Sequence, residues 1–269
     1  MTRVSGFDIR TAPCCGERYA VRAYASMNAM SNAFWTDGYR EQSLMPNDNG
    51  LRKCACGSYY ILRDMVELVH AAETDLPRPQ PVPGEELPAA IALARSPATE
   101  RAARLDLWHA LNHPYRARYR AHRDAENAKI APATGEGGAD AFGAPLRKWW
   151  QKLLGIHPAP IAAVSPPAPP APPSPAAIAT PTRKPAFTVP PFMPTPEQTD
   201  NMEKLLALLM GDPKSDLYAL EIAELYREMG QFEEAQPWLK DLLPHLDGPC
   251  ARVIRDLIAE RQTAPMRYR

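Results

Sequence analysis

Apolar and polar residues alternate over short segments within the first 64 residues of the chain. Residues 19–24 alternate between two faces, and residues 59–62 form an aromatic and aliphatic run. Both patterns are typical of short strands. Turn-forming residues separate them at residues 36–38 and 46–50. We therefore predict a small β-rich unit over residues 1–64.

The spacing of apolar residues changes to three and four after Asp64, which predicts helices. A first helix is expected directly after Asp64. A second helical stretch covers residues 89–128, with a break near His113 because Pro114 follows. These elements make a helical middle region over residues 65–130.

The C-terminal part, residues 195–263, predicts three or four further helices. Thr195 and Gln198 have the spacing of a capping box, which opens the first of them. The third is expected over residues 232–243. Small and large apolar residues alternate along these helices, so we predict that they pack into one helical module.

Composition separates this module from the preceding regions. Of the 31 prolines, 15 lie between Gly155 and Pro196, and residues 131–144 are rich in Gly and Ala. Such a composition lacks the apolar side chains that order a chain. We therefore predict a disordered linker over residues 131–194. The predicted fold class is a multidomain α+β protein with a β-rich N-terminal unit and a mostly α-helical remainder.

A short basic segment at residues 145–156 interrupts this linker and is expected to be helical. It contains Trp149 and Trp150 among Lys, Arg and Leu residues. Three interpretations stay open: docking onto one of the modules, binding of a protein partner, or weak peripheral contact with a membrane.

Four of the five cysteines form two close pairs, Cys14 with Cys15 and Cys54 with Cys56. Glycine follows each pair, as suits a turn with positive φ. Paired thiolates on two turns can supply the tetrahedral ligands of Zn²⁺. We therefore expect a structural Zn²⁺ site at these four residues. The alternatives are a degenerate site without metal and a redox role.

The segments TAPCCGERY (residues 11–19) and KCACGSYY (residues 53–60) resemble the two knuckles of the zinc-ribbon family. Both knuckles are shorter than the family's Cys-x-x-Cys-Gly pattern. Residues 32–57 also resemble uncharacterised bacterial zinc-ribbon proteins with a Trp-Thr-Asp-Gly insertion between the knuckles. This resemblance implies a fold but no activity. For Trp35 and Asp37 the choice lies between a buried aromatic beside a turn and a binding loop.

Residues 223–242 resemble a tetratricopeptide-like helical hairpin. The residues that match are Ala223, Tyr226, Gly230, Phe232, Ala235, Leu239 and Leu242. Small residues allow two antiparallel helices to approach closely. The closing proline of that family is missing, and one unit alone cannot bury its faces. The resemblance therefore implies a compact hairpin module that binds a protein partner.

Charge and motifs narrow the class of function. The chain has 31 basic and 31 acidic residues, no run of apolar residues long enough to span a membrane and no secretory segment, so a cytoplasmic location is expected. We find no phosphate loop, no nucleophile motif and no carboxylate pair in a context that shifts its pKa, which predicts a non-enzymatic protein. His109 and His113 share a helix face but lack a third ligand.

The sequence thus predicts an adaptor that binds protein partners through its C-terminal module. Residues 197–262 carry fourteen acidic and seven basic residues, which would repel phosphate. The alternative is a nucleic-acid-associated regulator that uses the zinc ribbon and the arginines of residues 116–123.

Overall fold

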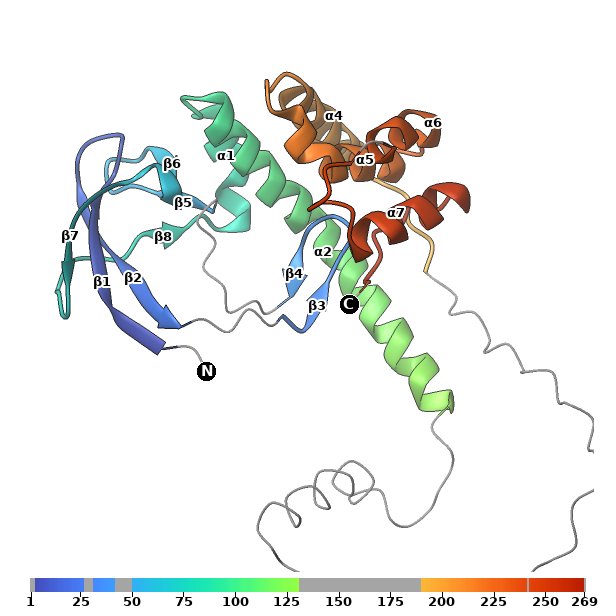
Figure 1. Ribbon diagram of the computed structural model, residues 1–269, viewed down its shortest axis with the longest axis horizontal. Helices are drawn as coiled ribbons and strands as arrows, with labels where there is room; N and C mark the ends of the chain where they lie inside the picture. Colours follow the sequence, from blue (N-terminus) through green and yellow to red (C-terminus); the bar gives the residue numbers. More distant parts are fainter. Residues whose placement is uncertain (1–2, 27–30, 42–49, 131–189, 241, 269) are drawn as a thin grey trace, which may run out of the picture. The chain divides into compact units, whose positions relative to one another are not determined.

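The computed structural model describes residues 3–26, 31–41, 50–130, 190–240 and 242–268 (Figure 1). The expected linker, and with it the helix expected at residues 145–156, lies outside the described residues except for its last few positions. The chain divides into two compact units, Met1–Arg120 with Val189–Arg269, and Ala121–Thr188. The account below concerns the first unit.

Three small antiparallel sheets contain all strands of the described residues. One sheet has the order β2-β1-β7, a second has the order β6-β5-β8, and β3 pairs with β4. The bounds are β1 Arg3–Thr11, β2 Arg18–Ser26, β3 Ala33–Phe34, β4 Arg40–Glu41, β5 Leu51–Lys53, β6 Tyr59–Ile61, β7 Val66–Ala71 and β8 Gln80–Pro81. The strands expected around residues 19–24 and 59–62 are thus confirmed.

The helix expected after Asp64 is wrong, because the segment forms strand β7. Its backbone pairs with β1, and its side chains form cross-strand ion pairs, His70 with Asp8 at 3.0 Å and Arg10 with Glu67 at 3.2 Å. Val66 and Val69 stay 60% and 58% exposed, so no apolar helix face is buried. A few apolar residues at helical spacing cannot outweigh pairing with a neighbouring strand.

Helices make up most of the remaining described chain. The α-helices are α1 Leu87–Ala92, α2 Pro97–Ile130, α4 Pro196–Met210, α5 Ala219–Glu228, α6 Phe232–Ala235 and α7 Pro249–Ala259. Single 3₁₀ turns cover Leu62–Asp64, Gly84–Glu86, Ser215–Tyr218 and Gln236–Leu239. Among the described residues no helix is both long and apolar enough to cross a membrane.

Helix α2 does not break at Pro114, contrary to the sequence-based expectation. A proline inside a helix leaves a carbonyl one turn earlier without its donor and disturbs its neighbours. Side chains supply donors beside that position. The guanidinium of Arg116 donates to the His109 carbonyl, and Gln198 Nε2 donates to the Leu111 carbonyl at 3.1 Å. The helix thus continues through Pro114 with side-chain donors on the carbonyls of His109 and Leu111, which flank the position that loses its amide donor.

The capping box at the start of α4 is confirmed. The Gln198 amide donates to the Thr195 hydroxyl at 3.2 Å, and the Thr195 amide donates to Gln198 Oε1 at 2.8 Å. The third C-terminal helix is shorter than expected: α6 ends at Ala235 and a 3₁₀ turn follows. Pro237 lies in this turn and has no N–H with which to continue an α-helix.

One apolar core joins α2 to the C-terminal helices. Trp108 is fully buried in a cluster with Met202, Leu205, Leu209 and Ile222, among others. The helices of residues 65–130 and of residues 195–263 are expected from the sequence to form separate regions, but in the structure they share this core. A second cluster joins α5, α6 and α7 and contains Ala223, Phe232, Ala235, Leu239, Ile254 and Ile258.

Replacing Ala235 with leucine is expected to lower the free energy of unfolding by about 1–3 kcal/mol, because the larger side chain overpacks a site that has no exposed surface. Ala259→Leu on the exposed side of α7 is the matched control and should change stability by less than about 0.5 kcal/mol. Denaturant titration of both variants measures the difference. Equal midpoints would show that the helices do not pack at Ala235.

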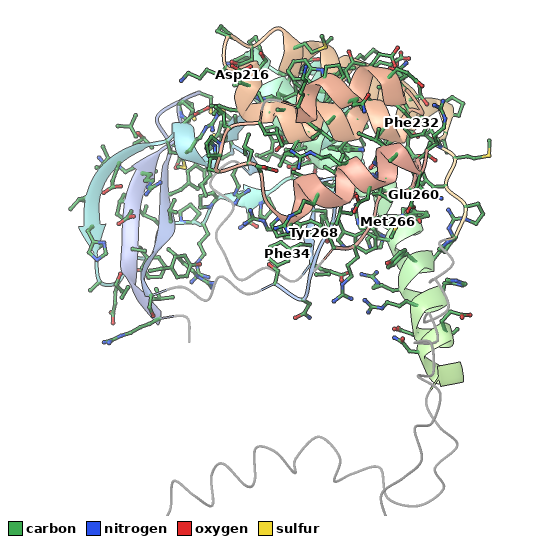
Figure 2. All side chains as sticks on the ribbon, turned by 45° about the vertical axis from the view of Figure 1, so that its right-hand side comes forward. Phe34, Asp216, Phe232, Glu260, Met266 and Tyr268 are labelled. Atoms are coloured by element: carbon green, nitrogen blue, oxygen red, sulfur yellow. The ribbon has the colours of Figure 1, made fainter. Side chains whose placement is uncertain are left out.

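The C-terminal residues complete the β3–β4 hairpin. Thr36 donates its amide to the Met266 carbonyl and accepts the Met266 amide on its hydroxyl, both at 2.9 Å. The Tyr268 amide donates to the Phe34 carbonyl at 2.9 Å, and the two rings lie 6.1 Å apart (Figure 2). The Trp-Thr-Asp-Gly segment is therefore held from one side by the end of the chain.

Candidate metal centre

Each cysteine pair lies in the turn of an antiparallel hairpin. The first turn joins β1 to β2 and is closed by the Ala12 amide, which donates to the Glu17 carbonyl at 2.8 Å. The second joins β5 to β6 and is closed by the Cys54 amide, which donates to the Ser58 carbonyl at 2.8 Å. We call these turns knuckle 1, residues 12–17, and knuckle 2, residues 54–58.

Glycine permits the backbone of both knuckles. Gly16 has φ +76° and Gly57 has φ +82°, as expected for the residue after each cysteine pair. These left-handed conformations are readily adopted only by glycine. Their amides close the inner turns, since Gly16 donates to the Ala12 carbonyl and Gly57 to the Cys54 carbonyl, both at 2.9 Å.

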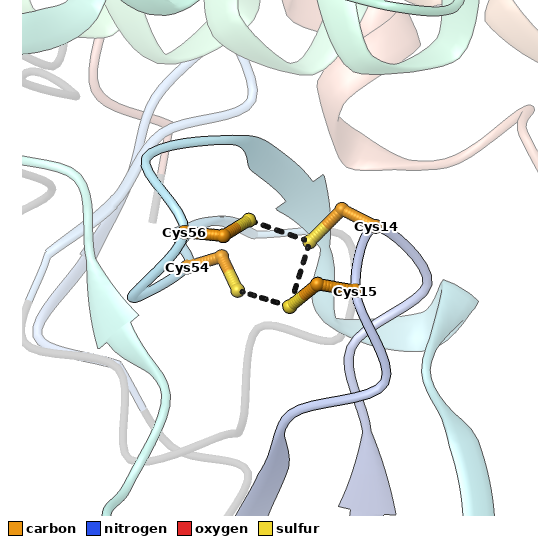
Figure 3. Close-up of side chains that lie close together, drawn as sticks. All are labelled: Cys14, Cys15, Cys54 and Cys56. Carbon is orange, nitrogen blue, oxygen red and sulfur yellow. Dashed lines mark hydrogen bonds between the residues drawn. The ribbon is translucent and has the colours of Figure 1, made fainter.

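The four sulfur atoms of Cys14, Cys15, Cys54 and Cys56 converge, and all lie within 4.8 Å of one another (Figure 3). The Sγ–Sγ distances are 3.9 Å between Cys14 and Cys15, 3.4 Å between Cys15 and Cys54, and 3.6 Å between Cys56 and Cys14. Four thiolates at Zn–S bonds of about 2.3 Å in tetrahedral geometry stand about 3.8 Å apart. The cluster could therefore hold a metal ion.

The adjacent pair in knuckle 1 reaches a common point because the turn bends sharply. In an extended strand the side chains of Cys14 and Cys15 would point to opposite faces. Here both sulfurs face knuckle 2, and Cys14 also packs against the cluster of Ala12, Tyr19, Cys54, Tyr60, Leu62 and Met65. The shortened spacing thus still allows convergence of the sulfurs.

Tyr19 forms hydrogen bonds with knuckle 2 next to Cys54, the buried member of the cysteine cluster. Its hydroxyl donates to Cys54 Sγ at 3.6 Å and accepts the Ala55 amide at 3.0 Å. Burial raises the pKa of Tyr19 to about 12, so the phenol remains a donor. Hydrogen bonds of this kind orient a ligand and fix its sulfur.

The thiols differ in their ease of ionisation. Burial, followed by contact with the other cysteines, raises the pKa of Cys14. Hydrogen bonds from the side chain and backbone of Ser58 lower the pKa of Cys56 to about 6. A metal ion binds thiolates, so its binding would release the protons that the other thiols retain. Metal affinity would accordingly rise with pH.

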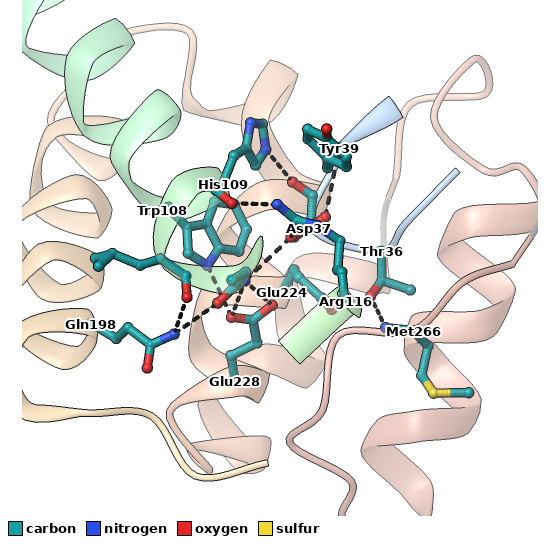
Figure 4. Close-up of polar contacts among 12 residues, drawn as sticks. Thr36, Asp37, Tyr39, Trp108, His109, Arg116, Gln198, Glu224, Glu228 and Met266 are labelled. Atoms are coloured by element: carbon teal, nitrogen blue, oxygen red, sulfur yellow. Dashed lines mark hydrogen bonds and ion pairs between the residues drawn. The ribbon is translucent and has the colours of Figure 1, made fainter. Parts of the chain in front are cut away.

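A buried ion-pair network, which no local pattern in the sequence predicts, lies in the same compact unit (Figure 4). Arg116 and Asp37, 1% and 0% exposed in their side chains, form an ion pair. The Asp37 carbonyl contacts His109 Nε2 at 2.9 Å. Of the two histidines considered above, His109 therefore binds this loop, whereas His113 is exposed.

Of the two interpretations of Trp35 and Asp37, the structure supports a buried aromatic beside a turn, but Asp37 does more than form that turn. Trp35 is fully buried, and Asp37 Oδ1 accepts the Tyr39 amide at 3.1 Å. The other oxygen of Asp37 accepts from Arg116 and from Asn112 Nδ2, the latter at 3.2 Å. Asp37 thus connects the turn between β3 and β4 to α2.

Glu228 of α5 is the centre of the second half of the network. It is fully buried and accepts from Trp108 Nε1 at 2.9 Å and from Asn112 Nδ2 at 3.1 Å. Its neighbour Glu224 forms a buried ion pair with Arg227, with N–O distances of 2.6 and 2.7 Å. Three buried carboxylates therefore face two buried guanidiniums, since Asp37 and Arg116 belong to the same network.

Burial, together with the charges of Glu224 and Asp37, raises the pKa of Glu228 well above its usual value; Arg227 and the Trp108 hydrogen bond only partly oppose this. A proton bound to Glu228 would balance the three carboxylates against the two guanidiniums. The expectation that no carboxylate pair lies in a pKa-shifting context is therefore wrong. It failed because Asp37, Glu224 and Glu228 meet only in the tertiary structure.

Glu228→Gln should flatten the loss of stability with rising pH. Folded Glu228 keeps its proton where the unfolded carboxyl has lost it, so wild-type stability is greatest below the unfolded pKa. It falls as pH rises toward the folded pKa, by about 1.4 kcal/mol per pH unit for one proton. Denaturant titrations between pH 5 and 8 measure the slope. The exposed Glu234→Gln is the control and should follow wild type; equal slopes for all three proteins would mean that Glu228 is ionised in the fold.

No protein family, curated protein or solved structure matches this chain in the comparisons with known proteins.

Proposed function

We propose that the chain is a non-enzymatic adaptor in which Zn²⁺, bound by Cys14, Cys15, Cys54 and Cys56, staples two hairpins and the helical part binds a protein partner. The convergence of four sulfurs from two hairpins carries the proposal. Four thiolates in tetrahedral arrangement suit Zn²⁺, or iron in sulfur clusters. With all four positions taken by sulfur, no position is left for a reacting water, which favours a structural role. The arrangement supports the proposed likeness to zinc ribbons.

Metal analysis of the purified protein tests the staple. We expect about one zinc ion per chain, absent from Cys54→Ser/Cys56→Ser and retained in Cys250→Ser. The last variant is the matched control, because Cys250 lies outside the cysteine cluster, near the Thr36 carbonyl at 3.9 Å and beside the apolar cluster of α5, α6 and α7. Iron in place of zinc would keep the proposed metal staple but contradict its assignment to Zn²⁺. The absence of any metal from reduced wild type would contradict the proposal.

The charges of the helical part favour a protein partner. The acidic residues of α4, α6 and α7 that face solvent are Glu197, Asp200, Glu203, Glu233, Glu234 and Asp256. The apolar residues of α5, α6 and α7 face inward, as the proposed tetratricopeptide-like hairpin requires. The outer surface is therefore available for binding, and its charge favours partner segments that carry Lys and Arg.

The arginines of α2 weaken the nucleic-acid alternative. Arg116 is buried against Asp37, and Arg120 forms an ion pair with Glu41. In the β-rich part, Lys53 is paired with Glu86 at 2.7 Å. Three of the basic groups that the alternative assigned to phosphate contacts are thus already neutralised by carboxylates.

Peptide selection against the full chain, with duplex DNA as competitor, separates the two functions. The proposal expects selected peptides to be basic and their binding to weaken in Glu233→Lys/Glu234→Lys while excess DNA has no effect. Displacement by DNA, together with DNA affinity that falls steeply with salt, would favour the nucleic-acid alternative.

A further inference from the structure

The thiols of the metal centre form two close contacts, each of which joins knuckle 1 to knuckle 2. Cys15 contacts Cys54 at 3.4 Å, and Cys14 contacts Cys56 at 3.6 Å. Each pair connects residues about 40 positions apart in sequence, 39 and 42 respectively. Each pair therefore links the same two knuckles that the proposed metal ion would link.

Backbone geometry disfavours a disulfide within knuckle 1. The Cα atoms of a disulfide usually lie about 4.4–6.8 Å apart, whereas adjacent residues such as Cys14 and Cys15 have Cα atoms only about 3.8 Å apart. Their sulfurs are also the most separated of the three measured contacts, at 3.9 Å. Oxidation is therefore not expected to close knuckle 1, and the two shortest contacts, which join the knuckles, are favoured.

Solvent reaches one member of each pair. Cys15 and Cys56 are exposed, Cys14 is half-buried and Cys54 is buried. A small oxidant can therefore react with an exposed sulfur whose less exposed partner sulfur lies within van der Waals distance of it. This is the arrangement of an attacked thiol beside a resolving thiol.

We propose that the centre is a hydroperoxide-sensitive thiol site, in which oxidation expels the metal and replaces it with the cross-knuckle disulfides Cys15–Cys54 and Cys14–Cys56. The metal-release part rests on the proposed function, whereas the disulfide pairing rests on the sulfur geometry alone. Because metal and disulfides join the same two hairpins, the fold persists in both states and the charge and coordination of the site change.

The chemistry requires one hydroperoxide per disulfide. The thiolate of Cys15 attacks one oxygen of H₂O₂, the O–O bond breaks, and Cys15 becomes a sulfenic acid while hydroxide leaves. The thiolate of Cys54 then attacks that sulfur, the S–S bond forms, and a second hydroxide leaves. The sulfurs lose two electrons in total, the peroxide gains them, and two protons convert the hydroxides to water. Cys56 and Cys14 react in the same way with a second peroxide.

The test treats reduced full-length Cys250→Ser protein with H₂O₂, in metal-loaded and metal-free form. Metal content is measured before the oxidant is added, released metal is followed with a chromogenic chelator, and linkages are mapped by mass spectrometry of non-reduced peptides. From the metal-loaded form we expect both cross-knuckle disulfides, stoichiometric metal release and full reversal by a phosphine reductant, and we expect the metal-free thiols to oxidise faster.

Two matched variants test the pairing. Cys14→Ser should form only Cys15–Cys54, and Cys15→Ser should form only Cys14–Cys56. In the metal-loaded protein, a Cys14–Cys15 or Cys54–Cys56 link, or oxidation to sulfinic acid without disulfides, would overturn the inference, and so would resistance of the metal-free thiols to the oxidant. Cross-knuckle disulfides in a protein that binds no metal when reduced would refute the proposed zinc staple and support the thiol site.

Discussion

Replacing Arg116 with methionine is expected to lower the free energy of unfolding by about 3–5 kcal/mol, which is the usual cost of removing one partner from a buried ion pair. The guanidinium of Arg116 pairs with Asp37 and donates to the His109 carbonyl. It also lies 4.0 Å from the centre of the Tyr39 ring. Methionine fills similar volume but leaves the Asp37 carboxylate buried without its cation. Denaturant titration at neutral pH measures the loss.

Arg118→Met is the control for helix propensity and charge, because Arg118 lies two residues away on α2 and is exposed. It should change stability by less than about 0.5 kcal/mol. Asp37→Asn/Arg116→Met should lose less than the sum of the single variants, because no unpaired charge remains buried. Additive losses, or an Arg116→Met protein as stable as Arg118→Met, would show that the ion pair does not form.

Local patterns could predict the cysteine hairpins. Each knuckle combines strand residues on both sides with a glycine at positive φ, and these features lie within about ten residues. The capping box at Thr195 could be predicted for the same reason. The convergence of the two cysteine pairs could also be predicted, because it follows if all four side chains serve as ligands of one metal ion.

The buried network could not be predicted, because its members are far apart in sequence. Arg116 and Asp37 are 79 residues apart, and Asn112 and Glu228 are 116 apart. In the sequence Arg116 belongs to an arginine-rich run and Glu228 to an acidic module, and both compositions suggest solvent exposure. Separation in sequence also explains why the helix was wrongly expected to break near Pro114. Gln198, which donates to the nearby Leu111 carbonyl, lies on the far side of the expected linker.

Two separate cores determine how far the proposed metal stabilises the chain. Leu51 and Tyr59 of the β5–β6 hairpin pack with Leu87, Ala90 and Ala103 of α1 and α2. In the β2-β1-β7 sheet, Ala12 and Tyr19 pack instead in the cluster behind the cysteines, with Cys54, Tyr60, Leu62 and Met65. Loss of the metal should therefore affect the two hairpins unequally.

Removal of the metal, by a strong chelator or by Cys54→Ser/Cys56→Ser, is expected to unfold the β2-β1-β7 sheet while β5 and β6 remain folded. Structural zinc contributes about 10–16 kcal/mol of apparent binding free energy in zinc-finger peptides, comparable with the whole stability of a small domain. Hydrogen exchange followed by mass spectrometry should show amides of residues 3–26 and 66–71 losing most of their protection, whereas residues 51–53 and 59–61 keep theirs. Cys250→Ser is the control and should retain protection throughout. Loss of protection in both hairpins would mean that the Leu51 and Tyr59 core depends on the metal as well, and unchanged protection in both would mean that the cysteine cluster adds nothing to the stability of the fold.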